Sequence, residues 1–82
     1  MTNEKIMQQL CMFLTEEFEI SPTLLKPEAL LQKDIGIDSL DYVDLVVHIY
    51  DTFGFKPKQE DLKQIKTLSD LCEYIARHNA SN

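Results

Sequence analysis

Hydrophobic residues recur every three or four positions in three stretches of the chain, and this spacing predicts amphipathic helices. The three stretches are residues 3–18, residues 39–53 and the residues from Thr67 to about His78. A shorter helical turn fits residues 58–64. No stretch alternates between apolar and polar residues as a half-buried strand does. The pattern therefore predicts an all-α fold, a small four-helix bundle of three main helices and one short helix.

The apolar face of the helix at residues 39–53 is unusually broad. Its hydrophobic residues cover well over half of the helical circumference, whereas a surface helix needs a stripe of little more than about 100°. The residues expected to face inward are Tyr42, Leu45, Val46, Ile49 and Phe53. Either the remaining apolar residues contact another molecule, or the helix is simply buried more deeply in a small bundle. Asp38 or Ser39 is expected to be its N-cap.

Residues 20–37 are predicted to form a long connection that packs against the core. Proline at position 22 ends the first helix, because it lacks a backbone donor and restricts the residue before it. Irregular turns are expected around Pro22 and Pro27. Six large apolar residues recur through this connection: Leu24, Leu25, Leu30, Leu31, Ile35 and Ile37. A polar linker would not contain them, so we expect a packed loop.

Composition and charge limit the function classes. The 82 residues are expected to form one domain, 1–82, with a net charge of −6. Residues 36–53 carry four Asp and no Lys or Arg, so the acidic character is concentrated there. This argues against nucleic acid or an anionic membrane as the partner. The longest apolar runs are far shorter than a membrane span, and the N-terminus lacks signal-peptide features, so we expect a cytoplasmic protein.

The two cysteines do not suggest a metal site. Cys11 and Cys72 lie far apart in the sequence, with no neighbouring Cys or His at ligand spacing. Both fall on apolar helical faces, so the expectation is two small buried side chains; a disulfide or a reactive thiol is the alternative. His48 has no identifiable nucleophile near it, and it is expected to be a solvated surface residue.

The stretch Asp34-Ile35-Gly36-Ile37-Asp38-Ser39-Leu40 resembles the attachment motif of acyl carrier proteins, commonly D-L-G-x-D-S-L. The resemblance extends over most of the chain, from the Ile20-Ser21-Pro22 turn to Tyr74-Ile75. It implies a carrier, not an enzyme, with a covalent 4′-phosphopantetheine arm from coenzyme A on Ser39. The implied partners are a phosphopantetheinyl transferase and enzymes that synthesise or transfer acyl chains.

The physical chemistry of the motif agrees with this resemblance. A serine at a helix start keeps its hydroxyl clear of the helix body, where a modifying enzyme can reach it. Free backbone N–H groups and the positive end of the helix dipole are expected to tolerate the phosphodiester. Gly36 allows a sharp turn before the helix. By the resemblance, Asp38 helps to present the serine to a metal-dependent transferase.

The resemblance also implies that partner enzymes read the second helix. The aspartates expected to meet basic patches are Asp38, Asp41, Asp44 and Asp51, and the apolar contacts between them are Leu40, Val43 and Val47. Charge complementarity supplies fast encounter without tight binding. An acyl chain is expected to enter the core among Phe13, Leu14, Val46, Ile49, Phe53, Leu71 and Ile75. We expect a monomer.

Several departures from the family pattern leave alternatives open. Tyr50 and Thr52 stand where glutamates are common, and the segment Gly54-Phe55-Lys56-Pro57-Lys58 is more basic than usual. A carrier dedicated to a specialised pathway is therefore an alternative to the carrier of fatty acid synthesis. Aminoacyl and peptidyl carriers typically have glycine or histidine just before the serine, where this chain has Asp38. An unmodified helical adaptor is the third class.

Overall fold

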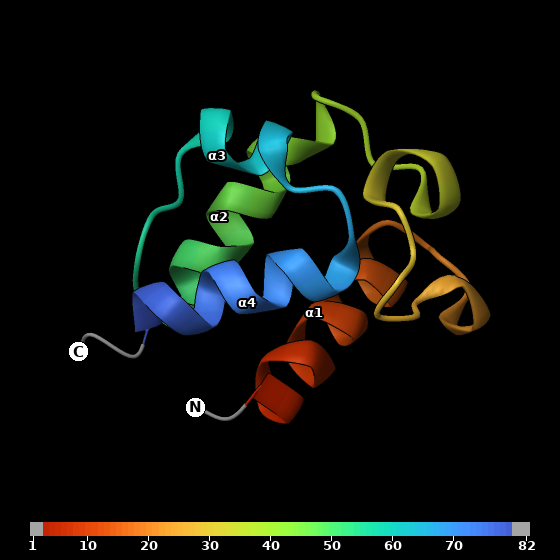
Figure 1. The fold of residues 1–82 in the computed structure, drawn as a ribbon, viewed down its shortest axis with the longest axis horizontal. Helices are drawn as coiled ribbons and strands as arrows, with labels where there is room; N and C mark the ends of the chain where they lie inside the picture. Colours follow the sequence, from red (N-terminus) through yellow and green to blue (C-terminus); the bar gives the residue numbers. More distant parts are fainter. Residues whose placement is uncertain (1–2, 80–82) are drawn as a thin grey trace.

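A computed structural model describes residues 3–79, and its regular elements are all helical (Figure 1). They are α1 (Asn3–Glu17), a 3₁₀ turn η1 (Pro22–Leu24), a π-helical turn η2 (Leu31–Ile35), α2 (Asp41–Phe53), α3 (Gln59–Gln64) and α4 (Leu68–Asn79). Within the described part of the chain there is no strand, and an isolated bridge joins Leu30 to Thr67. The prediction of a small all-α bundle with three long helices and one short helix is confirmed.

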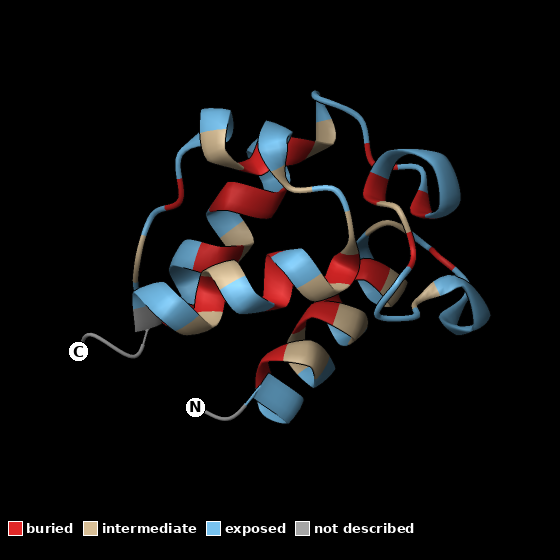
Figure 2. Ribbon diagram, in the orientation of Figure 1, coloured by how far each residue is buried: buried red, intermediate tan, exposed pale blue. Residues whose placement is uncertain are grey.

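The helices pack in two pairs around one core. α1 lies against α4, and α2 lies against α3. In Figure 1, α4 runs across the lower part of the view and α2 descends toward it. Buried residues line the inner sides of all four helices and of the long connection (Figure 2). The fully buried side chains are Ile6, Leu10, Leu14, Leu31, Ile37, Tyr42, Leu45, Ile49, Leu62, Leu68, Leu71 and Ile75.

α1 ends through a left-handed residue and not through the proline that follows. Glu19 has a φ of 56°, and the Ile20 N–H donates to the Leu14 carbonyl at 3.2 Å. The Leu14 and Ile20 side chains are both buried, so the chain turns back toward the core at Glu19. α1 ends at Glu17, within one residue of the predicted boundary, and this turn, not Pro22, separates the helix from the connection.

The long connection packs against the core as predicted, with one exception and one surprise. Ile20, Ala29, Leu31, Ile35 and Ile37 are buried, but Leu24 is exposed, as are the other two residues of η1. The surprise is η2, a helical turn in a segment that was predicted to be part of a packed loop. This turn forms where backbone bonds join the connection to the start of α4. The bonds are Leu31 N–H to the Lys66 carbonyl, Leu68 N–H to the Ala29 carbonyl and Ser69 N–H to the Pro27 carbonyl.

α4 begins with a cap that its sequence predicts, because Thr67-Leu68-Ser69-Asp70 resembles a capping box with Asp in place of Glu. The Thr67 hydroxyl accepts a hydrogen bond from the Asp70 N–H at 3.1 Å. The helix continues to Asn79, one residue beyond the predicted fraying at His78. Cys72 is buried on this helix, Cys11 is half-buried on α1, and both are free thiols. Burial raises the pKa of each thiol, which matches the expectation of two small packed side chains better than that of reactive groups.

Candidate functional site

A glycine turn delivers the segment before α2 to the surface. Gly36 has a φ of 90°, a left-handed conformation that glycine adopts without a steric penalty. The two isoleucines on either side, Ile35 and Ile37, are buried and anchor the turn. The Ile37 N–H donates to the Leu31 carbonyl at 2.8 Å. Residues 38–40 are therefore exposed on a short segment that is fixed at both ends.

Asp38 and Asp41 form a reciprocal cap at the start of α2. The Asp38 Oδ1 accepts the N–H groups of Leu40 at 3.0 Å and Asp41 at 3.2 Å. In return, the Asp41 Oδ2 accepts the Asp38 N–H at 3.2 Å. This is the reciprocal pattern of a capping box, with aspartate three residues after the capping residue, and it lies in the turn of residues 38–41 that leads into α2. Of the two predicted caps, Asp38 is the one whose side chain accepts these bonds, and Asp41 has a structural role that was not predicted.

Ser39 follows the cap residue directly and is exposed. The capping hydrogen bonds are accepted by the carboxylates of Asp38 and Asp41, and the Ser39 hydroxyl takes no part in them. One expectation has to be corrected at this point. The N–H groups of Asp38, Leu40 and Asp41 already bind carboxylates, so they do not receive a phosphate. An anion on Ser39 would extend toward solvent, and the residues present fit a flexible arm attached at one exposed oxygen.

The Asp34 carboxylate belongs to η2, away from the cap. Its Oδ2 accepts the Leu30 N–H at 2.9 Å, which closes the turn that ends at Gly36. The motif therefore contains two kinds of residue. Asp34, Gly36 and Asp38 shape the backbone before the helix, whereas the exposed side chains of Ser39 and Leu40 take no part in these bonds.

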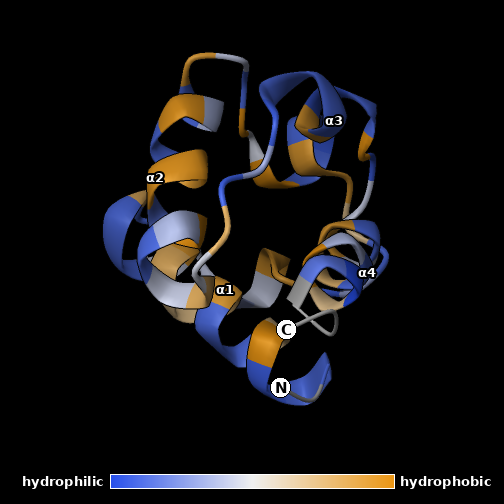
Figure 3. Cartoon of the chain, turned by 90° about the vertical axis from the view of Figure 1, so that its left-hand side faces the viewer, coloured by the Kyte–Doolittle hydropathy of each residue, from blue (hydrophilic) through white to orange (hydrophobic). Residues whose placement is uncertain are grey.

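The outer side of α2 has a continuous row of exposed hydrophobic side chains, which we name the apolar stripe. Its members are Leu40, Val43, Val47 and Tyr50, which are 80%, 49%, 54% and 55% exposed. Their spacing of three, four and three positions places them on one helical face. Hydrophobic residues recur along the whole of α2 (Figure 3). Tyr50 was missing from the predicted docking set, although this spacing identifies it.

The aspartates of α2 do not all have the same surroundings. Asp44 and Asp51 are exposed, whereas Asp41 is partly buried and bonded within the cap. The predicted inward set is confirmed, since Tyr42, Leu45, Val46, Ile49 and Phe53 are all buried. The broad apolar face is thus two faces, one in the core and one at the surface.

His48 is not the solvated residue that the sequence led us to expect. Its ring stacks on Phe13 of α1, with 3.7 Å between centroids and 10° between planes. Its Nε2 lies 3.4 Å from the Thr52 hydroxyl, within hydrogen-bond distance. Burial lowers the pKa of His48, and the carboxylates of Asp51 and Glu17 oppose this shift in part. His48 therefore connects two helices, and it is packed because α1 covers this side of α2.

The structure brings the seven residues of the predicted acyl-chain core into one buried cluster. Those residues are Phe13, Leu14, Val46, Ile49, Phe53, Leu71 and Ile75. Tyr42, only three residues after Ser39, is also fully buried, and its hydroxyl accepts a hydrogen bond from the Gln32 amide at 3.3 Å. This tyrosine fills the part of the core that lies nearest to the start of α2.

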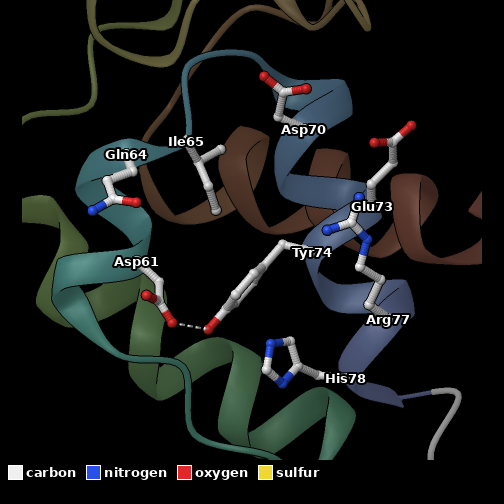
Figure 4. A pocket seen from close by; sticks show the side chains of 8 residues that line it. All are labelled: Asp61, Gln64, Ile65, Asp70, Glu73, Tyr74, Arg77 and His78. Atoms are coloured by element: carbon white, nitrogen blue, oxygen red, sulfur yellow. Dashed lines mark hydrogen bonds between the residues drawn. The ribbon is translucent and has the colours of Figure 1, made fainter.

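A polar hollow lies between α3 and α4 (Figure 4). The Tyr74 hydroxyl points across it and donates to the Asp61 carboxylate at 2.9 Å. Burial and this carboxylate raise the pKa of Tyr74. The ring centroids of Tyr74 and His78 are also 4.4 Å apart, and the His78 ring stacks on that of Phe55. These contacts fasten the short helix α3, and the segment before it, to α4.

Residues 3–79 contain neither a candidate metal cluster nor a membrane-spanning helix. No group of three or more His, Cys, Asp or Glu in that range is arranged to hold a metal ion. No helix there is both long and apolar enough to cross a membrane.

Comparison with known proteins identifies the family of this chain. Residues 8–75 match the family model described as "Phosphopantetheine attachment site". The acyl carrier protein of Lactobacillus johnsonii is 32% identical over 78 residues, which cover 95% of this chain and 98% of that protein. That of Phytoplasma mali is 36% identical over 73 residues, covering 89% and 87%. That of Coprothermobacter proteolyticus is 37% identical over 75 residues, covering 92% of each chain.

The chain therefore belongs to the phosphopantetheine-attachment family of acyl carrier proteins. Its cofactor is 4′-phosphopantetheine, and its role is that of a carrier and not of an enzyme. Membership also implies interaction with a phosphopantetheinyl transferase and with biosynthetic enzymes.

Proposed function

We propose that Ser39 carries the 4′-phosphopantetheine arm and that the chain transports acyl intermediates on it as thioesters. One observation carries the assignment: Ser39 is exposed directly after a cap whose bonds are complete without its hydroxyl. The Asp38–Asp41 box holds the backbone on either side of the serine. A transferase can therefore approach a fixed, accessible oxygen without unfolding the helix start.

We further propose that the apolar stripe and the exposed aspartates of α2 form the docking face for partner enzymes. Leu40 lies next to Ser39, and Asp44 and Asp51 flank the stripe farther along the helix. Partners would present basic side chains around a shallow apolar groove. Contacts of this kind give rapid, reversible encounter, which a shuttle among several enzymes requires. The chain is proposed to act as a monomer in the cytoplasm, with 1–82 as a single domain.

The assignment of Ser39 is tested by its replacement with alanine. Ser39→Ala should fold with unchanged helicity, because no capping bond uses its hydroxyl, and it should not gain the phosphopantetheine mass after incubation with coenzyme A and a transferase. The matched control is Ser21→Ala, an exposed serine in the long connection, which should be modified completely. An arm detected by mass spectrometry on the Ser39→Ala variant would overturn the proposal.

A further inference from the structure

A second surface hollow lies where η2 meets the segment between α3 and α4. Its volume is about 350 Å³, and its lining residues are Leu30, Gln32, Lys33, Lys63, Ile65 and Lys66. Backbone contacts hold the two rims together, since the Leu31 N–H donates to the Lys66 carbonyl at 2.8 Å and a bridge joins Leu30 to Thr67. The volume falls at the lower end of the range for small-molecule sites.

The lining of this hollow combines an apolar floor with positive charge alone. Leu30 and Ile65 supply the floor, and three of the eight basic residues of the chain stand around it. Its lining contains no carboxylate. The hollow between α3 and α4 in Figure 4 is different, because Asp61, Asp70 and Glu73 line it together with Arg77. In a chain of net charge −6, a basic hollow without acids suits an anion that also has an apolar part.

One hydrogen bond connects the hollow to the helix that follows the proposed attachment residue. Gln32, one of its lining residues, donates from Nε2 to the Tyr42 hydroxyl at 3.3 Å. Tyr42 lies in the first turn of α2, three residues after Ser39. The lining of the hollow is therefore fastened to the start of the helix that Ser39 precedes.

From this juxtaposition we infer that the hollow receives acyl groups whose free end is a carboxylate. The hydrocarbon part would lie on Leu30 and Ile65, and the carboxylate would meet the ammonium groups of Lys33, Lys63 and Lys66. Lysine suits such a site because its flexible stem can cover apolar surface while its charged end stays at the rim. The inference rests on the arm at Ser39 and specifies the class of cargo for which this carrier is built.

The test compares two cargoes of equal length on the same protein. A transferase loads the chain from hexanoyl-coenzyme A or from adipoyl-coenzyme A, which has a carboxylate at its far end. The adipoyl form should shift the backbone amide resonances of residues 30–33 and 63–66 relative to the hexanoyl form and to the free-thiol form. Its thioester should also react several-fold more slowly with hydroxylamine.

Charge variants decide whether the lysines cause these effects. Combined Lys33→Gln, Lys63→Gln and Lys66→Gln should abolish the difference between the adipoyl and hexanoyl forms. A control at two other lysines, Lys56→Gln with Lys58→Gln, should keep it, because these lysines lie outside the hollow. The difference should also shrink from about 0.1 M to 1 M salt, over which the screening length falls from about 10 Å to 3 Å.

Three outcomes would overturn the inference. Equal shifts for the adipoyl and hexanoyl forms would mean that the carboxylate is not recognised. Shifts already present in the free-thiol form would identify the phosphodiester of the arm as the anion. An adipoyl effect that persists in the triple variant would exclude the lysines. The mass of each loaded protein reports attachment separately, so a failure at Ser39 is distinguishable from a failure of the hollow.

Discussion

The imidazole of His48 on α2 lies flat on the ring of Phe13 on α1, with centroids 3.7 Å apart. This stack joins the helix that bears the docking face to the N-terminal helix. Only the neutral imidazole is easily accommodated there, because the ring is partly removed from water. The negative charges of Asp51 on α2 and Glu17 on α1 favour the protonated ring and so oppose part of the effect of burial on its pKa.

This relationship predicts a pH dependence of stability. The pKa of His48 is lowered in the folded protein, so the unfolded chain binds the proton first as the pH falls. The contribution of His48 to the free energy of unfolding is therefore fully present above the ordinary histidine pKa of 6.5. It is lost as the pH falls from that value to the lower pKa of the folded state. His48→Phe keeps an aromatic stack without a titrating group. Between pH 7.5 and 5.5, the denaturation midpoint of the wild-type protein should fall more than that of His48→Phe. Parallel pH profiles would contradict the prediction.

Much of the fold follows from periodicity, because residues that share one helical face share one environment. The inward set of α2, including Tyr42 and Phe53, was predicted on this basis, and all of its members are buried. Periodicity does not say which residues of two different helices meet. The stack of His48 on Phe13 is therefore not predictable from periodicity, which leads one to expect a solvated side chain at this polar position.

The local hydrogen bonds of the site were only partly predictable. An aspartate three residues after a cap residue was recognised at Thr67 and Asp70, yet the same spacing at Asp38 and Asp41 was overlooked. The π-helical turn η2 could not be found from its sequence. It depends on the long-range bond from the Leu31 N–H to the Lys66 carbonyl and on the Asp34 carboxylate. A single apolar pair four residues apart, Leu31 and Ile35, is too short a repeat to predict a helical turn.

The capping box allows the two roles of Asp38 to be separated. Asp38→Ala should lower the free energy of unfolding by about 1 kcal/mol, since it removes the acceptor for two N–H groups. Asp38→Asn keeps an acceptor oxygen and should restore most of that stability. The charge itself is lost in Asp38→Asn, so this stable variant should be modified by the transferase more slowly than the wild-type protein. Normal modification of a stable Asp38→Asn protein would show that Asp38 only holds the helix start.

The exposed aspartates provide a cleaner test of electrostatic docking than the capping pair. Asp44→Lys with Asp51→Lys leaves the box intact and should slow both modification and acyl loading. The loss should be greater at low salt, because interactions between exposed charges are screened over about 8–10 Å at ordinary ionic strength. Glu28→Lys with Glu73→Lys makes the same charge change on other exposed elements. Equal rates for the two double variants at low salt would mean that α2 is not the docking face.

A saturated acyl chain has no charge to place on the lysines, so the buried core remains its predicted site. Burial contributes about 0.8 kcal/mol per CH₂ in the ideal case, less the cost of parting packed side chains. The melting temperature should therefore rise from the unloaded protein to a medium-chain form.

The variant Ile75→Val tests where that chain lies. It removes one methylene from the predicted site and should lower the free energy of unfolding of the unloaded protein by about 0.5–1.5 kcal/mol. An octanoyl chain should recover part of that loss by filling the space. Ile37→Val, at an equally buried position outside the predicted set, should show no such recovery. A melting temperature indifferent to chain length, with equal losses in loaded and unloaded Ile75→Val, would place the saturated cargo outside the core.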